Sequence, residues 1–129
     1  MSKRRSIEID GFGHGTNPIP AASRVGNIVM TGGVYGLDPQ SRAIPDGAAD
    51  QCRLMFANLK RILAAAGASP DDVVKITVFI KDPSVRDVVN PEWTAMFPDA
   101  SSRPARHTLV NPYLAANMLI QCEALAVLA

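Results

Sequence analysis

An amphipathic helix followed at once by a β-branched strand is the feature that most constrains this chain. Apolar side chains recur every three or four positions between residues 48 and 66, which is the period of one helical face. Gly67 can take the left-handed conformation that ends a helix, and residues 73–80, VVKITVFI, alternate as a strand with one buried face requires. Because each element has one apolar face to bury, we predict that this helix packs on a sheet containing the strand.

Weaker patterns complete the expected order of elements. Further strands are predicted at residues 6–10, 25–34, 106–110 and 117–128. Asn90 and Pro91 are typical of an N-cap and a first helical residue, so a second helix is expected there. This order favours the α+β class, with a mixed, mostly antiparallel sheet and the two main helices on one face. Residues 1–129 are expected to form one domain, with residues 1–16 as an amino-terminal strand and loop.

Composition argues against nucleic-acid and membrane partners. Lys plus Arg total 13 and Asp plus Glu total 12, which leaves a formal net charge of +1, and only 5% of the residues are aromatic. Neither a basic surface for phosphates nor a set of stacking platforms for bases is therefore expected. No uncharged apolar run reaches the ~20 residues of a membrane span, and no apolar stretch follows the basic start, so we expect a cytoplasmic protein.

The sequence contains none of the common metal, cofactor or nucleophile motifs. Cys52 and Cys122 have no nearby Cys or His in the spacing of zinc or redox motifs, so we interpret them as reduced, packed thiols. The patterns of serine hydrolases, P-loop proteins and zinc proteases do not occur. His14, in a glycine-rich loop, and His107, in a predicted strand, also lack metal-ligand spacing, and their roles stay open. No metal and no cofactor are predicted.

Arg106 is the polar side chain whose surroundings matter most. Strand alternation places Arg106 and Thr108 on one face of their strand, and Gln121 and Glu123 on one face of the last strand. If the two strands are neighbours, Arg106 faces Gln121 or Glu123. A partly buried guanidinium needs an anionic partner, which is either Glu123 or the carboxylate of a ligand held through two parallel hydrogen bonds. The residues alone leave both alternatives open.

Two residues near the second helix also allow more than one interpretation. Asn90 is explained by its N-cap position or by direct contact with a ligand. Trp93 and Phe97 lie four residues apart on one helical face, which is typical of core or subunit contacts, or else of the wall of a substrate site.

Four strings of the sequence carry a resemblance to a known family. They are GNIVMTGGVYGLDP, QCRLMFANLKRILAAAGASPDDVVKITVFIKD, VNPEWTAMFPDASSRPARHTLV and IQCEALAV. Over roughly residues 17–128 the chain resembles the RidA (YjgF-like) family, also called RutC or endoribonuclease L-PSP-like. The most specific parts are NLKRILAAAGAS with the strand after it, and the RPAR motif that contains Arg106.

The resemblance implies a chorismate mutase-like α+β fold that assembles as a barrel-like homotrimer, with a cleft at each interface built from more than one chain. It also implies that Arg106 grips the carboxylate of a small enamine or imine, such as 2-iminobutanoate or 2-iminopropanoate, which is hydrolysed to a 2-keto acid and ammonia. Asn90 matches the family's asparagine ahead of the second helix. Trp93 matches an aromatic position that is usually tyrosine.

Several site positions depart from the family's pattern. Gly32 stands where other members have serine, Ile19 replaces a tyrosine, and Thr108 replaces a cysteine, so a less polar pocket and a bulkier substrate are expected. The first acid of the last strand, credited with positioning the attacking water, is Gln121, whereas the second acid is kept as Glu123.

The resemblance therefore implies two catalytic residues, Arg106 and Gln121. The residues expected to bind the substrate are Arg106, Asn90, Gly32, Gly33, Ile19, Trp93, Thr108 and Glu123. Because an amide cannot exchange a proton at any useful pH, a slow enzyme, another substrate, or a non-catalytic ligand-binding or regulatory trimer all stay open. A ribonuclease or translation inhibitor is disfavoured by the balanced charge.

Overall fold

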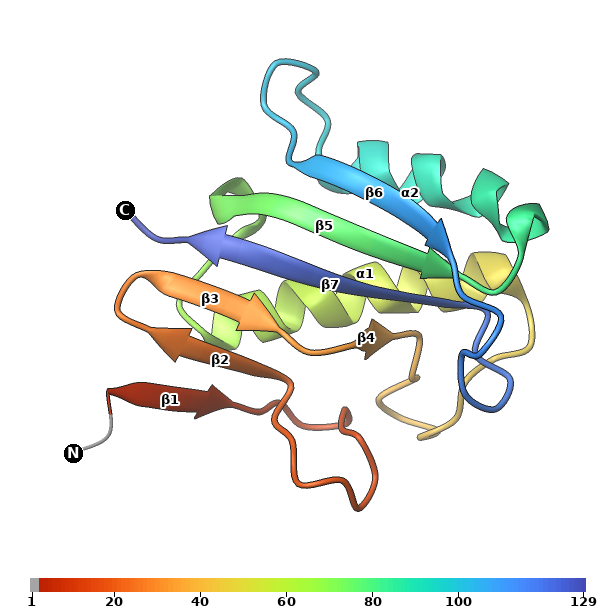
Figure 1. Cartoon of the computed structure of the whole chain (residues 1–129), viewed down its shortest axis with the longest axis horizontal. Coiled ribbons are helices and arrows are strands. Elements are labelled where there is room, and N and C mark those ends of the chain that lie inside the picture. Colours follow the sequence, from red (N-terminus) through yellow and green to blue (C-terminus); the bar gives the residue numbers. More distant parts are fainter. Residues whose placement is uncertain (1–2) are drawn as a thin grey trace.

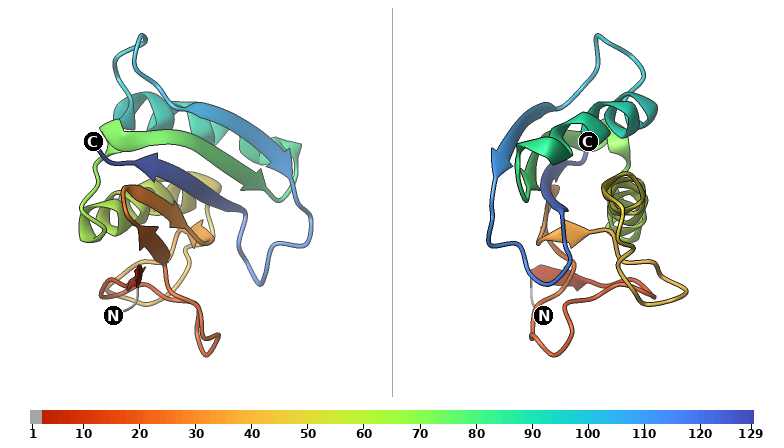
Figure 2. Two further views of the ribbon diagram at one scale, coloured as in Figure 1. Left: turned by 60° about the vertical axis from the view of Figure 1, so that its left-hand side comes forward. Right: turned by 90° about the vertical axis from the view of Figure 1, so that its right-hand side faces the viewer.

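One sheet with two helices on one of its faces makes up the structure (Figures 1 and 2). The computed structural model describes residues 3–129. The strands are β1 (Arg4–Ile7), β2 (Ala22–Val25), β3 (Ile28–Thr31), β4 (Val34–Tyr35), β5 (Val73–Ile80), β6 (Ala105–Val110) and β7 (Ile120–Val127). The helices are α1 (Ala48–Ala65) and α2 (Val89–Met96), with 3₁₀ turns η1 (Pro70–Asp72) before β5 and η2 (Pro83–Val88) before α2. The predicted α+β class is confirmed.

The strands lie in the order β1-β2-β3-β7-β5-β6, and β4 pairs with β7 beyond the end of β3. Every pairing is antiparallel except that between β5 and β6, which run side by side in the same direction (Figure 1). The sheet is thus mostly antiparallel, as predicted. Since β6 has a neighbour on one side only, it forms an edge of the sheet.

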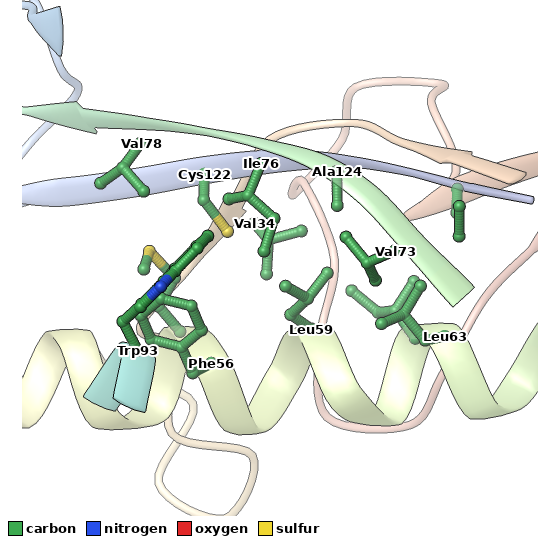
Figure 3. Close-up of a cluster of buried hydrophobic side chains, with 14 of the residues drawn as sticks. Val34, Phe56, Leu59, Leu63, Val73, Ile76, Val78, Trp93, Cys122 and Ala124 are labelled. Atoms are coloured by element: carbon green, nitrogen blue, oxygen red, sulfur yellow. The ribbon is translucent and has the colours of Figure 1, made fainter. Parts of the chain in front are cut away.

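The core lies between α1 and the two central strands. Leu59 and Leu63 of α1 are fully buried and point toward Ile76 of β5 and Cys122 and Ala124 of β7 (Figure 3). This arrangement confirms the predicted packing of the amphipathic helix on the β-branched strand. Both cysteines are buried free thiols, as predicted from the sequence.

The predicted single strand at residues 25–34 is wrong, because a tight turn divides it. β2 and β3 form a hairpin with Val25 opposite Ile28, and Gly26 has φ +58. A glycine adopts this conformation without steric cost, which lets two residues reverse the chain. β3 then ends at Thr31, and the pair Gly32–Gly33 separates it from β4. The first strand, predicted at residues 6–10, lies at Arg4–Ile7.

The predicted N-cap role of Asn90 is also wrong. α2 begins at Val89 and continues directly from η2. The Val89 N–H, at the start of α2, donates a hydrogen bond to the Arg86 carbonyl oxygen of η2. Because the preceding 3₁₀ turn satisfies a donor that a capping side chain would otherwise satisfy, Asn90 stands inside the first turn of α2. Its side chain is available for another contact.

The face of the sheet opposite the helices carries no helix (Figure 2). We call it the open face, and its exposed apolar side chains are Val25, Ile28, Met30, Leu109 and Val127. More than half of the surface of Met30, 53%, is exposed. Val25, Ile28 and Val127 lie opposite one another on β2, β3 and β7, and an exposed apolar patch of this kind is typical of an interaction site. Neither α1 nor α2 is long and apolar enough to cross a membrane, and the same holds for every helix within residues 3–129.

Candidate functional site

Arg106 is held at the β6 edge by two side chains of α2. On β6 it lies opposite Ile76, whose buried side chain faces the helices, so Arg106 also points to the helix side of the sheet. Its Nη2 donates to Oδ1 of Asn90 at 2.9 Å. Its guanidinium carbon lies 4.7 Å from the ring centre of Trp93, which is a cation–π contact. The Asn90 and Trp93 contacts together fix the plane of the guanidinium.

Trp93 is itself anchored in the core and can therefore act as a rigid platform. Its ring packs edge-on against Phe97, with centroids 4.8 Å apart. It also packs edge-on against Phe56 of α1, at 6.5 Å (Figure 3). Only 8% of its surface is exposed. Of the two interpretations from the sequence, core packing is therefore confirmed for Trp93, and one face of the same ring also supports Arg106.

The guanidinium of Arg106 lacks a protein carboxylate within the described part of the chain. No salt bridge between described residues includes Arg106, and its Nη1 is buried without a hydrogen-bond partner. Burial lowers the pKa of Arg106, and the nearby positive charge of Arg86 lowers it further, although an arginine stays charged at any physiological pH. Leaving a buried donor unsatisfied costs about 1–3 kcal/mol. An anionic ligand at this position would remove that cost.

The alternative in which Arg106 pairs with Glu123 is wrong. β5 lies between β6 and β7, so the two strands are not neighbours. Arg106 lies in the row of Ile76 and Ala124, whereas Glu123 lies in the next row, opposite Thr77. Since successive residues point to opposite faces, Arg106 faces the helices and Glu123 faces the open side.

A second group of predicted site residues gathers on the open side, where β4 meets β7. Gln121 of β7 lies opposite Tyr35 of β4, and its amide packs directly against Gly33. A Cβ added at Gly33 would lie 2.5 Å from Nε2 of Gln121, so the amide occupies the space that any side chain at position 33 would need. At Gly32 the nearest atom would be 3.6 Å away, which leaves room.

Ile19 lies in the amino-terminal loop beside this second group. It is 51% exposed and lines several hollows, two of which concern the site. One, of about 350 Å³, also has Met30, Thr31 and Gly32 in its walls. The other, of about 570 Å³, is lined by the residues of the glycine-rich loop, including His14. The structure therefore brings Ile19 and Gly32 together, as expected for a shared site.

The predicted site residues thus fall into two groups that do not meet within one chain. We call them the arginine group, with Arg106, Asn90, Trp93 and Thr108, and the glutamine group, with Gln121, Gly32, Gly33, Ile19 and Glu123. Thr108 lies two residues after Arg106 on the same face of β6, opposite Val78. The two groups lie on opposite faces of the sheet.

His14 lies beside the glutamine group, although the sequence left its role open. Its Nε2 lies 2.8 Å from the carbonyl oxygen of Gly33, and its Nδ1 is buried without a partner. Its ring contacts Phe12 and Tyr35, at centroid distances of 5.5 and 6.0 Å. The only signal in the sequence was a histidine flanked by glycines. His107, by contrast, is exposed on the open face, with its Nδ1 3.0 Å from Nζ of Lys75.

Comparison with known proteins agrees with this architecture. Residues 16–128 match the family model described as endoribonuclease L-PSP. A RutC family protein of Pyrococcus abyssi is 36% identical over 110 residues, covering 84% of this chain and 85% of the relative. The 2-iminobutanoate/2-iminopropanoate deaminase of Escherichia coli K12 is 35% identical over 104 residues, covering 80% and 81%.

Solved structures superpose over nearly the whole chain. The structure of E. coli TdcF with bound serine has a TM-score of 0.88 at 30% identity and covers 97% of this chain and 99% of that one. The structure of the E. coli YjgF gene product has a TM-score of 0.87 at 30% identity, covering 97% and 99%.

Proposed function

The chain belongs to the RidA (YjgF-like, endoribonuclease L-PSP) family, and we propose that it hydrolyses a small carboxylate-bearing enamine or imine to a 2-keto acid and ammonia. The observation that carries this proposal is Arg106, whose guanidinium is fixed by Asn90 and Trp93 while Nη1 has no partner among the described residues. The relative named as a 2-iminobutanoate/2-iminopropanoate deaminase supports the same class of substrate.

Arg106 binds the substrate carboxylate in this proposal. A planar guanidinium presents N–H donors in a fork that matches a carboxylate through two parallel hydrogen bonds. Because Asn90 and Trp93 already hold the plane of the guanidinium, little conformational entropy is lost when the ligand arrives. The neutral partners also leave the positive charge uncompensated, which favours an anion.

We further propose that the site is completed by a second copy of the chain within a homotrimer. The arginine and glutamine groups lie on opposite faces of the sheet, so one chain cannot bring both to one substrate. If the β6 edge of one copy packs beside the β4–β7 region of the next, Arg106 of one chain approaches Gln121 of the other. The exposed apolar side chains of the open face supply a surface that such an assembly would bury.

The reaction itself demands little beyond positioning. An enamine first tautomerises to the imine, water then adds to the carbon of the C=N bond, and the C–N bond of the carbinolamine breaks to release ammonia and form the keto group. Arg106 would hold the carboxylate and the Gln121 amide would orient the water, whereas Gln121 cannot move a proton. Holding the reactants in a productive geometry supplies much of the acceleration.

The test couples the purified protein to an amino-acid dehydratase that releases the imine, and follows its decay. We expect wild-type protein to accelerate decay and Arg106→Ala to abolish the acceleration. Arg53→Ala is a matched control, since Arg53 is exposed on α1 and pairs only with Asp50 across one helical turn. Decay at the uncatalysed rate with wild-type protein would contradict the proposal.

A ligand-binding or regulatory trimer is the second candidate, and the observation that favours it is the amide at position 121 in place of an acid. A 2-keto acid would then raise the melting temperature of the wild-type protein but not that of Arg106→Ala, with no turnover of imine. Measurable turnover would exclude this second candidate.

A further inference from the structure

We propose that His14 is the proton-transferring catalytic residue of this site and replaces the acid that Gln121 lacks. This proposal rests on the deaminase function proposed above and names a residue that neither the motifs nor the resemblance singled out. It concerns the glutamine group, where the described chain places His14, Gly33 and Gln121 next to one another.

Gly33 connects the imidazole to the amide. Its carbonyl oxygen lies 2.8 Å from Nε2 of His14. The amide of Gln121 packs against the Cα of Gly33, where a side chain would otherwise stand. A carbonyl oxygen can only accept, so Nε2 carries a proton and donates it. In the neutral ring this leaves the lone pair on Nδ1, and in the charged ring it places the exchangeable proton there. The Gly33 carbonyl therefore selects the atom that acts, as an orienting partner of a catalytic histidine does.

Nδ1 of His14 is one of two buried side-chain polar atoms without a partner in the described part of the chain, and Nη1 of Arg106 is the other. Buried polar groups are nearly always hydrogen-bonded, so an exception needs an explanation. The explanation proposed for Nη1 is the substrate carboxylate, and the analogous explanation for Nδ1 is the water and the nitrogen of the same substrate. His14 also helps to line the hollow of about 570 Å³, together with Ile19 of the glutamine group.

The other titratable groups around His14 are poorly suited to the same task. Glu8 and Arg42 also line the hollow, but neither is hydrogen-bonded to the ring in the part of the chain that the structure describes. Tyr35 packs against the imidazole, and its hydroxyl already donates to the Gly13 oxygen. Burial also raises the pKa of Tyr35, so the phenol stays protonated at neutral pH. An imidazole ring, in contrast, has two nitrogens, so one can accept a proton while the other keeps its hydrogen bond.

The proton moves through His14 in a balanced cycle. As water forms the new C–O bond, it transfers a proton to Nδ1, and the π electrons of C=N move to nitrogen. The imidazolium returns that proton to the nitrogen, which gives the carbinolamine. Nδ1 then takes the hydroxyl proton as C=O forms and passes it to the nitrogen, so that the C–N bond breaks with its electrons leaving on ammonia. Imine and water are consumed, and 2-keto acid and ammonia are produced, with no other reactant.

The test separates proton transfer from support of the loop. His14→Gln can still donate from its amide to the Gly33 carbonyl but cannot exchange a proton, so kcat for imine hydrolysis is expected to fall by about 100-fold or more. Adding Gln121→Glu to that variant supplies a carboxyl beside Gly33 and is expected to raise kcat again by at least tenfold. A purely structural role of His14 would not produce this recovery. His107→Ala, at the only other histidine, is the matched control and should keep its activity.

The outcomes distinguish this proposal from the one on which it rests. Wild-type protein without turnover would remove the deaminase function itself. Turnover in wild-type that is undiminished in a folded His14→Gln protein would overturn only the role of His14, as would a double variant no faster than His14→Gln. In ¹⁵N-histidine-labelled protein, 2-oxobutanoate should shift the Nδ1 resonance of His14 and not that of His107, and an unchanged His14 signal would also contradict the proposal.

Discussion

Nη2 of Arg106 donates to Oδ1 of Asn90 at 2.9 Å, although the two residues lie on different elements, β6 and α2. The guanidinium carbon also lies 4.7 Å from the ring centre of Trp93, and Nη1 is buried without a partner in the described part of the chain. Neither partner carries a negative charge. A neutral clamp of this kind orients a cation without neutralising it, and the first prediction follows from that distinction.

Replacing Asn90 by Ala and by Asp should have different effects on ligand binding. Asn90→Ala removes the hydrogen bond and loosens Arg106, so we expect the Kd for a 2-keto acid to rise about tenfold, the equivalent of a hydrogen bond to a charged group. Asn90→Asp places a carboxylate against Nη2, which competes with the ligand and should weaken binding more. Titration calorimetry with a 2-keto acid measures both, with Asn27→Ala as the control. Tighter binding to Asn90→Asp than to wild-type protein would be inconsistent with Arg106 as the anion site.

Alanine substitutions at three nearby glycines should lower the melting temperature by different amounts. At Gly32 the new Cβ meets nothing closer than 3.6 Å, so little change is expected. At Gly33 the new Cβ displaces the flexible amide of Gln121, so a moderate decrease in melting temperature is expected. At Gly36 it clashes with the backbone carbonyl of Gln51 in α1, which cannot move aside, so the decrease should be largest there. The melting temperature measured by differential scanning calorimetry should therefore be highest for Gly32→Ala, lower for Gly33→Ala and lowest for Gly36→Ala. An equal loss at all three positions would refute the close packing at Gly33.

A charge on the open face should dissociate the assembly without unfolding the chain. Met30→Glu puts a carboxylate on a β3 position that is 53% exposed in one chain and is expected to be buried between copies. Sedimentation velocity should show a smaller species, while far-UV circular dichroism keeps the signal of the folded chain. Arg53→Glu changes an exposed position on the helix side and serves as the control. A Met30→Glu protein with the wild-type sedimentation coefficient would argue against assembly through this face.

The thiol of Cys52 should resist alkylation at pH 8 and make stability fall in alkaline solution. Burial first, then the charge of Glu92, raises its pKa from 9.0 to about 12. Between these values the unfolded chain releases the proton while the folded chain keeps it, so the free energy of unfolding falls as pH rises from about 9 to 12. Urea unfolding curves at pH 8 and 10 should show a smaller decrease in Cys52→Ala than in wild-type protein. The same decrease in both proteins would show that other groups cause the loss.

Local patterns in the sequence determined the elements and the chemistry of one side chain. The apolar period of residues 48–66 and the alternation of residues 73–80 predicted α1 and β5, because helix and strand periodicities depend on residues only a few positions apart. The same signals failed where two local preferences competed. Gly26 ended β2 inside an apolar run, and the turn of η2 displaced Asn90 from the cap position that its type favours.

The arrangement of the site depended on contacts between distant residues, which only the folded chain decides. β5, and not β7, pairs with β6, and this choice places Arg106 on the helix side and Gln121 and Glu123 on the open side. The neighbour of a strand is set by how the whole sheet packs on its helices. A register shift of one residue moves every side chain of a strand to the other face of the sheet. For the same reason the residue type of His14 was visible in the sequence, whereas its contact with Gly33, nineteen positions away, was not.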